Sequence, residues 1–184
     1  MLKAAGKINH LMHEGKAVNK MHILGIDPGY ATLGYGIIQY KSNKFKPIYY
    51  GAVITEPDEK FSIRLEKLYD TVFELCQIYK PDAMAIEKLF FTTNQKTAIN
   101  VAQARGVILL AAQKNNIPAF EYTPLQVKQS VVGYGKALKT QVMEMTKRLL
   151  CLEKVPKPDD TADALAVAIC HAHSAGSRLN NLKY

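Results

Sequence analysis

Two short apolar segments of the sequence each end in a carboxylate. Residues 22–28 (HILGIDP) carry Asp27 just before a Pro-Gly pair, and residues 83–86 (AMAI) lead directly into Glu87. Apolar runs of this length, bounded by turn residues, are typical of strands buried in a sheet. A strand that leaves the core at an acidic residue presents that carboxylate at the rim of the sheet, where folds place functional groups.

The order of the remaining elements predicts a mixed sheet. The polar link KSNK between two apolar segments favours a hairpin, and strands that alternate with helices later in the chain favour parallel pairing. The expected fold class is therefore α/β, with a mixed five-stranded sheet flanked by helices. In chain order we expect strands at 22–28, 33–40 and 45–54, a helix at 61–79, a strand at 83–86, a helix at 94–114, a strand at 117–122, and helices at 124–132, 137–150 and 160–173.

Length and charge limit the classes of function. The chain of 184 residues is long enough for one domain with a sizeable core. No apolar run approaches the roughly 20 residues that a membrane-spanning helix needs. A net charge of +8 favours a polyanionic partner, nucleic acid ahead of a membrane surface, although a basic protein without such a partner stays equally open. Three widely spaced cysteines without a CxxC pattern predict reduced thiols and a cytoplasmic location.

Four carboxylates come from three separated segments. Besides Asp27 and Glu87, the last helix opens with Asp160 and Asp163 in DDTADALAVA, and their i, i+3 spacing places both on one face. Each acid also has a simpler interpretation, because Asp27 can make a turn, Glu87 can be the first solvated residue, and Asp160 can cap the helix. Together these interpretations require three coincidences, so we favour one common site.

Carboxylates that cluster repel one another, and some take up protons unless a cation neutralises them. Hard oxygen ligands without His or Cys nearby in sequence point to Mg²⁺ or Mn²⁺. Two such ions about 4 Å apart activate water and stabilise the leaving oxygen in phosphodiester hydrolysis. We therefore expect two Mg²⁺ ions per subunit, with Mn²⁺ able to replace them.

Aromatic and basic residues near these acids suggest nucleic-acid contacts. Phe90 and Phe91 follow Glu87 by three and four positions. We expect Phe91 to fold back onto the core and Phe90 to stack on bases or wedge between them. Lys128 and Lys139 flank a glycine-containing loop upstream of the acidic helix, where gripping phosphates is at least as good an interpretation as a solvated face.

Five motifs in order carry a family resemblance. They are ILGIDPG with GYG, AIEKLFF, QARG, QVKQSVVGYGKALK and DDTADALAVAICHAH. Together they resemble the successive motifs of the RuvC Holliday-junction resolvases over about residues 21–175. GIDPG alone is weak, whereas QVKQSVVGYGKA together with the DxxDALA helix is specific.

The resemblance implies a ribonuclease-H-like fold and a homodimer that nicks two opposed strands of a four-way DNA junction with Mg²⁺, in homologous recombination and DNA repair. It also implies a partnership with the RuvA–RuvB branch-migration complex. By motif, the catalytic residues and metal ligands are Asp27, Glu87, Asp160 and Asp163. Some relatives carry His where this chain has Asp160, so the geometry of that position carries over least directly.

The same resemblance assigns roles in DNA and dimer contact. It implies that Phe90 stacks on a base near the junction centre, and that Lys128 and Lys139 hold phosphates near the scissile bond. The long helix with Gln103 and Gly106 forms much of the dimer contact, although packing on its own sheet explains its small residues equally well.

Three other functions fit parts of the pattern. A ribonuclease-H-like nuclease of the YqgF type would act on RNA, but the Lys-Gly loop and the Phe pair argue against it. A sugar-kinase or actin-like ATPase shares a first phosphate loop that GIDPG resembles, but needs a second domain and a second Gly-rich loop. A junction-binding protein that does not cleave would not need all four acids.

The first residues differ from the rest of the chain. Residues 1–20 lack the apolar stretch of a secretory signal and the Arg and Ser of a transit peptide, and Met21 directly precedes the first strand. We predict a poorly ordered extension at 1–20, the ribonuclease-H-like nuclease domain at 21–175 and a tail at 176–184.

Overall fold

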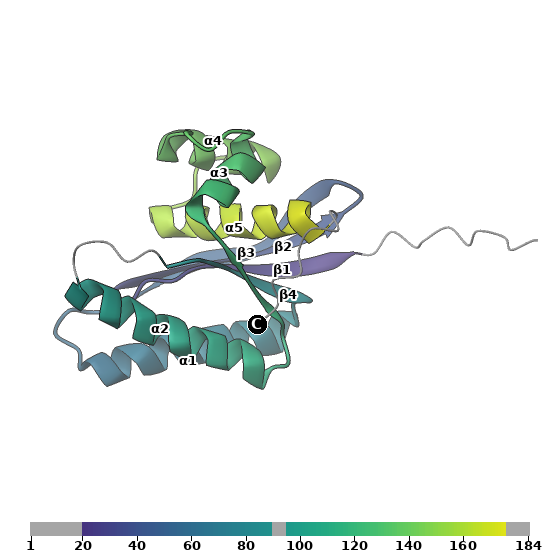
Figure 1. The fold of residues 1–184 in the computed structure, drawn as a ribbon. Coiled ribbons are helices and arrows are strands. Elements are labelled where there is room, and N and C mark those ends of the chain that lie inside the picture. The colour runs from purple at the N-terminus through teal and green to yellow at the C-terminus, as the bar shows by residue number, and fades with distance from the viewer. Residues whose placement is uncertain (1–19, 90–94, 176–184) are drawn as a thin grey trace, which may run out of the picture.

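The computed structural model describes residues 20–89 and 95–175, and a five-stranded sheet with the order β3-β2-β1-β4-β5 forms its centre (Figure 1). The first three strands pair antiparallel, whereas β4 pairs parallel with both β1 and β5. This arrangement confirms the predicted mixed sheet. The strands are β1 (Met21–Asp27), β2 (Thr32–Lys41), β3 (Lys44–Ile54), β4 (Ala83–Glu87) and β5 (Ala119–Tyr122).

Helices cover both faces of the sheet. Figure 1 shows α1 and α2 on one face, and α5 on the other with α3 and α4 stacked outside it. Successive residues of β1 serve two separate cores, because Ile23 packs into the α5 side and Leu24 into the α1 and α2 side. The helices are α1 (Phe61–Tyr79), α2 (Gln95–Lys114), α3 (Pro124–Val132), α4 (Lys139–Leu149) and α5 (Asp159–Ala175).

Helix ends follow local capping chemistry. At the start of α3, Thr123 and Gln126 form a reciprocal capping box, and the helix stops at Gly133, whose φ of 93° suits glycine. Helix α1 stops at Lys80 in the left-handed region, directly before Pro81. The predicted boundaries of these two helices are confirmed. Helix α4 begins two residues later than predicted because Leu138 is extended.

Helix α5 lies almost directly on the backbone of β1 and β2. A Cβ atom on Gly25 would lie 2.0 Å from the carbonyl oxygen of Ala164, and one on Gly34 would lie 2.0 Å from that of Asp160. Only glycine leaves room for so close an approach. Since Gly34 pairs with Asp27 across the β1–β2 ladder, this approach brings the start of α5 beside the end of β1.

Several predictions from the sequence fall outside the described residues. Residues 1–19 and 176–184 belong to the predicted extension and tail, and Phe90 and Phe91 lie in the undescribed segment 90–94. Within 20–89 and 95–175, none of the helices has the length and apolar character needed to cross a membrane. The three cysteines are free thiols, with Cys76 and Cys170 buried.

The seat of α5 on glycine can be tested with Gly25→Ala. The added methyl would also lie 2.8 Å from the Cβ of Ala168, so helix and strand must separate. We expect the free energy of unfolding in urea to fall by about 1–3 kcal/mol. Asp70→Asn, at an exposed position of α1, is the control, because it alters no close packing. Equal stability of the two variants would contradict the close approach.

Candidate active site

The four predicted carboxylates come from three elements, and β1 and β4 end where α5 begins, at the same end of the sheet. Asp27 closes β1 and Glu87 closes β4, and the two strands run parallel as neighbours, with Ile26 opposite Ile86. Asp160 and Asp163 lie in the first turns of α5, which the glycine contacts hold against β1 and β2. The fold therefore gathers chain segments more than a hundred residues apart at one end of the molecule.

The electrostatics of Asp27 show that these acids are near one another. Burial, followed in order by the negative charges of Glu87, Asp163 and Asp160, raises the pKa of Asp27 to about 8. Burial also raises the pKa values of Glu87 and Asp163, and the charge of Asp163 adds to the effect on Glu87. At neutral pH the carboxylates therefore carry an electrostatic strain that a cation would relieve.

Lys139 already supplies one positive charge to this site. Its Nζ atom lies 2.8 Å from Asp163 Oδ2 and 3.7 Å from Asp159 Oδ2. The hydrogen bond to Asp163 is the main cause that raises the pKa of Lys139. The Lys139 charge in turn lowers the pKa values of Asp27 and Glu87, although burial outweighs it. Lys139, one of the two predicted phosphate contacts, thus lies among the acids.

An open pocket of about 240 Å³ adjoins these side chains. The charged side chains on its lining are Glu87, Asp163, Lys128 and Lys139, and its apolar wall consists of Pro124, Val127, Val142 and Val167. The pocket is smaller than those that enclose whole ligands, which hold about 300–1,000 Å³. Its size and its mixed charge suit one segment of a longer substrate.

The acids fit a divalent metal by chemistry, but they are not arranged as a finished metal site. In the described parts of the chain, no three His, Cys, Asp or Glu side chains converge as ligands of one ion. The donors near Asp27 are nonetheless all carboxylates, which Mg²⁺ and Mn²⁺ prefer, and their repulsion favours a cation. Binding therefore requires side chains to rotate, and Lys139 to release Asp163. The assignment of the four acids as metal ligands stays a prediction.

Comparison with known proteins decides the family. Residues 23–171 match the family model described as crossover junction endodeoxyribonuclease RuvC. The chain belongs to the RuvC family. The predicted family is thereby confirmed, and so is the ribonuclease-H-like fold class, through the solved RuvC structures that this fold matches.

Relatives in the RuvC family match most of the chain. A RuvC from Clostridioides difficile is 60% identical over 154 residues, covering 84% of this chain and 91% of that protein. One from Caldanaerobacter subterraneus is 53% identical over 164 residues, covering 89% of this chain and 99% of that protein. The structure is similar to Thermus thermophilus RuvC in complex with a Holliday junction substrate, with a TM-score of 0.81 and 36% identity over 84% of this chain and 94% of that one.

The structure also contains site features that the sequence analysis missed. Asp159 lies within ion-pair distance of Lys139, and the apolar pocket wall comes from three different helices. The glycines under α5 are part of the ILGIDPG and GYG motifs, but their contact with Asp160 and Ala164 is visible only in three dimensions. The alternation of Gly34 and Gly36 along β2, with Gly25 of β1 paired opposite Gly36, was the one signal that could have indicated a helix packed at backbone distance.

The raised pKa of Asp27 predicts how stability depends on pH in the absence of divalent ions. A folded pKa of about 8 against an ordinary 3.8 means that the folded protein holds a proton the unfolded chain has lost, so stability falls as pH rises from 4 to 8. Each pKa unit corresponds to about 1.4 kcal/mol of stability. Relaxation of the site reduces the change in the free energy of unfolding below this full value. Asp27→Asn should therefore leave the free energy of unfolding nearly unchanged at pH 4 and raise it by about 1–3 kcal/mol at pH 8.

Urea unfolding at both pH values in a chelating buffer measures this difference. Asp70→Asn, at an exposed position of α1, is the control and should behave alike at both pH values. A gain for Asp27→Asn that does not grow with pH would contradict the raised pKa of Asp27.

Proposed function

We propose that this member of the RuvC family is a divalent-metal-dependent endonuclease that resolves four-way DNA junctions in homologous recombination and DNA repair. One observation carries the proposal: carboxylates from β1, β4 and α5 lie close together at one end of the sheet. Lys139 lies among them, and Lys128 lies close to Glu87. The similarity to Thermus thermophilus RuvC, solved with a Holliday junction substrate, supports the same substrate class. Family membership favours this function over an RNA nuclease of the YqgF type and over a protein that binds junctions without cleaving.

The residues divide into those that hold metal and those that hold DNA. Asp27, Glu87, Asp160 and Asp163 would bind two Mg²⁺ ions per subunit, or Mn²⁺ in their place. The ions supply Lewis-acid polarisation of the scissile phosphate and a water of lowered pKa. The four carboxylates would balance the positive charge of the ions and fix their positions. Because Asp27, Glu87 and Asp163 are largely buried, few water molecules would compete with them as ligands.

Two lysines are placed to bind the DNA backbone beside the acids. Lys139 contacts Asp163, and its side chain is 54% exposed, so the ammonium group can turn to a phosphate when a cation takes over the carboxylate. Lys128 lowers the pKa of Glu87 and lines the same pocket, which supports a second phosphate contact close to the proposed cleavage position. We further propose that Phe90, which is outside the described residues, stacks on a base near the junction centre.

An exposed face of α2 supports the proposed homodimer. Ile99 and Leu110 are 59% and 48% exposed, and Gly106 between them borders open space. Together with Gln103 these residues lie on one side of the helix. A second copy of the chain packed there would bury the apolar side chains, and its two-fold symmetry would match the two strands to be nicked.

We also propose the RuvA–RuvB complex as a partner and the cytoplasm as the location.

Replacing one acid tests the proposed cleavage. Asp27→Asn should reduce nicking of a four-way junction in Mg²⁺ at least about 100-fold, because the metal contributes several kcal/mol to the transition state. Junction binding in chelator should be retained. Gel analysis of the products on a mobile junction should show paired, symmetric nicks for wild type and for the control Asp70→Asn. Near-normal cleavage by Asp27→Asn would contradict the assignment of Asp27 as a metal ligand.

A charge on the exposed face of α2 tests the homodimer. Leu110→Lys should convert the protein to a monomer in sedimentation experiments at micromolar concentration, because the ammonium group would be desolvated in the contact. Ile54→Lys on β3 makes a comparable change at an exposed apolar position, and should leave the dimer intact. An unchanged dimer in Leu110→Lys would move the contact away from this face.

A further inference from the structure

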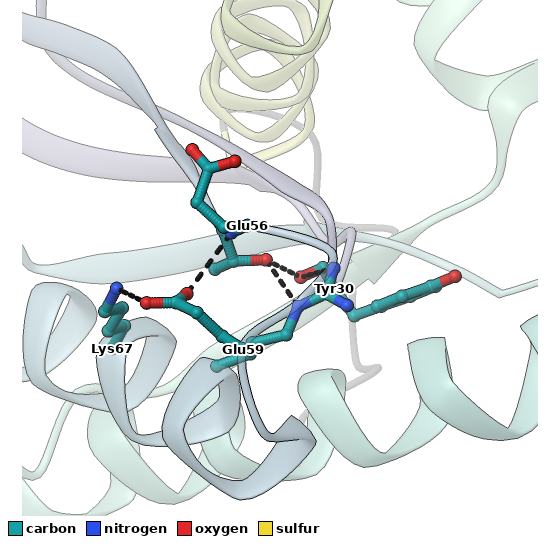
Figure 2. Close-up of polar contacts among 6 residues, drawn as sticks. Tyr30, Glu56, Glu59 and Lys67 are labelled. Carbon is teal, nitrogen blue, oxygen red and sulfur yellow. Dashed lines mark hydrogen bonds and ion pairs between the residues drawn. The ribbon is translucent and has the colours of Figure 1, made fainter.

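The turn that follows Asp27 is tied to the end of β3 by a set of hydrogen bonds to its carbonyl oxygens (Figure 2). The hydroxyl of Thr55 donates to the carbonyl oxygen of Tyr30 at 2.7 Å. The backbone N–H of Thr55 donates to the carbonyl oxygen of Ala31 at 3.0 Å. Thr55 is buried, so these bonds are shielded from water.

Arg64 on α1 holds this arrangement together. Its Nε donates to Thr55 Oγ1 at 2.8 Å, and its Nη2 donates to the Tyr30 carbonyl oxygen at 3.4 Å. The guanidinium carbon also lies 4.8 Å from the centre of the Tyr30 ring, in a cation–π contact. One side chain therefore contacts the turn through its backbone, through its aromatic ring and through the residue that anchors it.

The burial of Arg64 is unusual for a cation. The residue is only 8% exposed, its hydrogen bonds are to neutral groups, and the ion pairs among the described residues do not include it. The hydrogen bond from Lys67 is the main cause that lowers the pKa of Glu59, and the charge of Arg64 contributes less. Glu59 nearby is instead paired with Lys67 (Figure 2). Burying a charge without a carboxylate partner contributes little to stability and commonly costs some. This favours a role in holding a particular backbone conformation.

The backbone conformation in question is that of the residues directly after the β1 carboxylate. On one side, the β1–β2 ladder pairs Asp27 with Gly34. On the other side, the turn is tight, because a Cβ on Gly29 would lie 2.1 Å from the carbonyl oxygen of Thr32. The Tyr30 carbonyl is three residues from Asp27, so the turn that Thr55 and Arg64 hold directly follows the strand end that carries the carboxylate.

We propose that Arg64 is a positioning residue of the nuclease reaction, which acts through Thr55 and the Tyr30 carbonyl to hold the turn that aims the Asp27 carboxylate at a divalent cation. This inference rests on the proposed function of Asp27 as a metal ligand. It predicts that Arg64 and Thr55 influence metal affinity although neither touches the metal. Partners that orient metal ligands in this way typically change the affinity about 10- to 100-fold when they are removed.

Isosteric and conservative variants of the full chain separate positioning from stability. Thr55→Val removes the hydroxyl with little change of shape, whereas Thr55→Ser keeps it. Arg64→Met removes the guanidinium, and Arg64→Lys keeps the charge but loses the two-pronged geometry. Asp70→Asn, at an exposed position of the same helix α1, is the control, because it removes a charge away from the turn.

Three measurements decide the outcome. Mn²⁺ binding by electron paramagnetic resonance, without DNA, should weaken about 10-fold in Thr55→Val and Arg64→Met, partly in Arg64→Lys, and not in Thr55→Ser or Asp70→Asn. The Mg²⁺ concentration for half-maximal junction nicking should rise in parallel, with the rate recovering at high Mg²⁺. Urea unfolding reports stability separately, and Thr55→Val decides the question should Arg64→Met fail to fold.

Lower stability with unchanged Mn²⁺ affinity and unchanged Mg²⁺ half-saturation in Thr55→Val would overturn the inference and leave Arg64 a structural residue. Wild-type protein that neither binds Mn²⁺ nor nicks a junction would overturn the proposed function itself. The two failures are distinguishable because the second appears without any substitution.

Discussion

The approach of α5 to the glycines of β1 and β2 is the constraint on which the site depends. Without side chains at Gly25 and Gly34, the helix backbone rests on the strands, and Asp160 comes to the position beside Asp27. Larger residues would hold the helix about a side chain's thickness away, as in ordinary helix–sheet packing. The acids of α5 and β1 would then interact weakly, and the pKa of Asp27 would not respond to Asp160 and Asp163. The packing of the fold and the chemistry of the site therefore have one physical cause.

Collecting carboxylates in a partly buried place makes the metal-free protein electrostatically strained. The strain is visible in the raised pKa values of Asp27, Glu87 and Asp163, and Lys139 relieves only part of it. Such a site favours a cation strongly, yet it also repels a DNA phosphate until that cation is present. The lysines at its margin, Lys128 and Lys139, reduce this repulsion, so the charge pattern suits a reaction in which metal and polyanion are bound together.

The elements of the fold were predictable because their signals are local. Thr123 and Gly133 mark the ends of α3 within a few residues of themselves, and the apolar runs of β1 and β4 reflect burial on both faces of a sheet. Where a boundary was wrong, as at Leu138, the N-cap residue has no polar side chain to mark it, and the cap comes from Gln141, which accepts from the Leu138 N–H. The proximity of the four acids was also predictable, since the carboxyl ends of neighbouring parallel strands and the start of a helix packed on them lie at the same end of the sheet.

Contacts that depend on which surfaces meet were not predictable in this way. The sequence around Arg64 does not distinguish a buried arginine from an ordinary solvated one on the surface of a helix. Its partners are a backbone carbonyl and a threonine that lie outside α1. Backbone partners leave no pattern of matching residues. The ladder and the turn hold the backbone at Asp27 from both sides, whereas Lys139 is a long exposed side chain that can leave Asp163 at little cost. Cation binding by the proposed ligands would therefore depend mainly on rotation of side chains, because the ladder and the turn hold the backbone at Asp27.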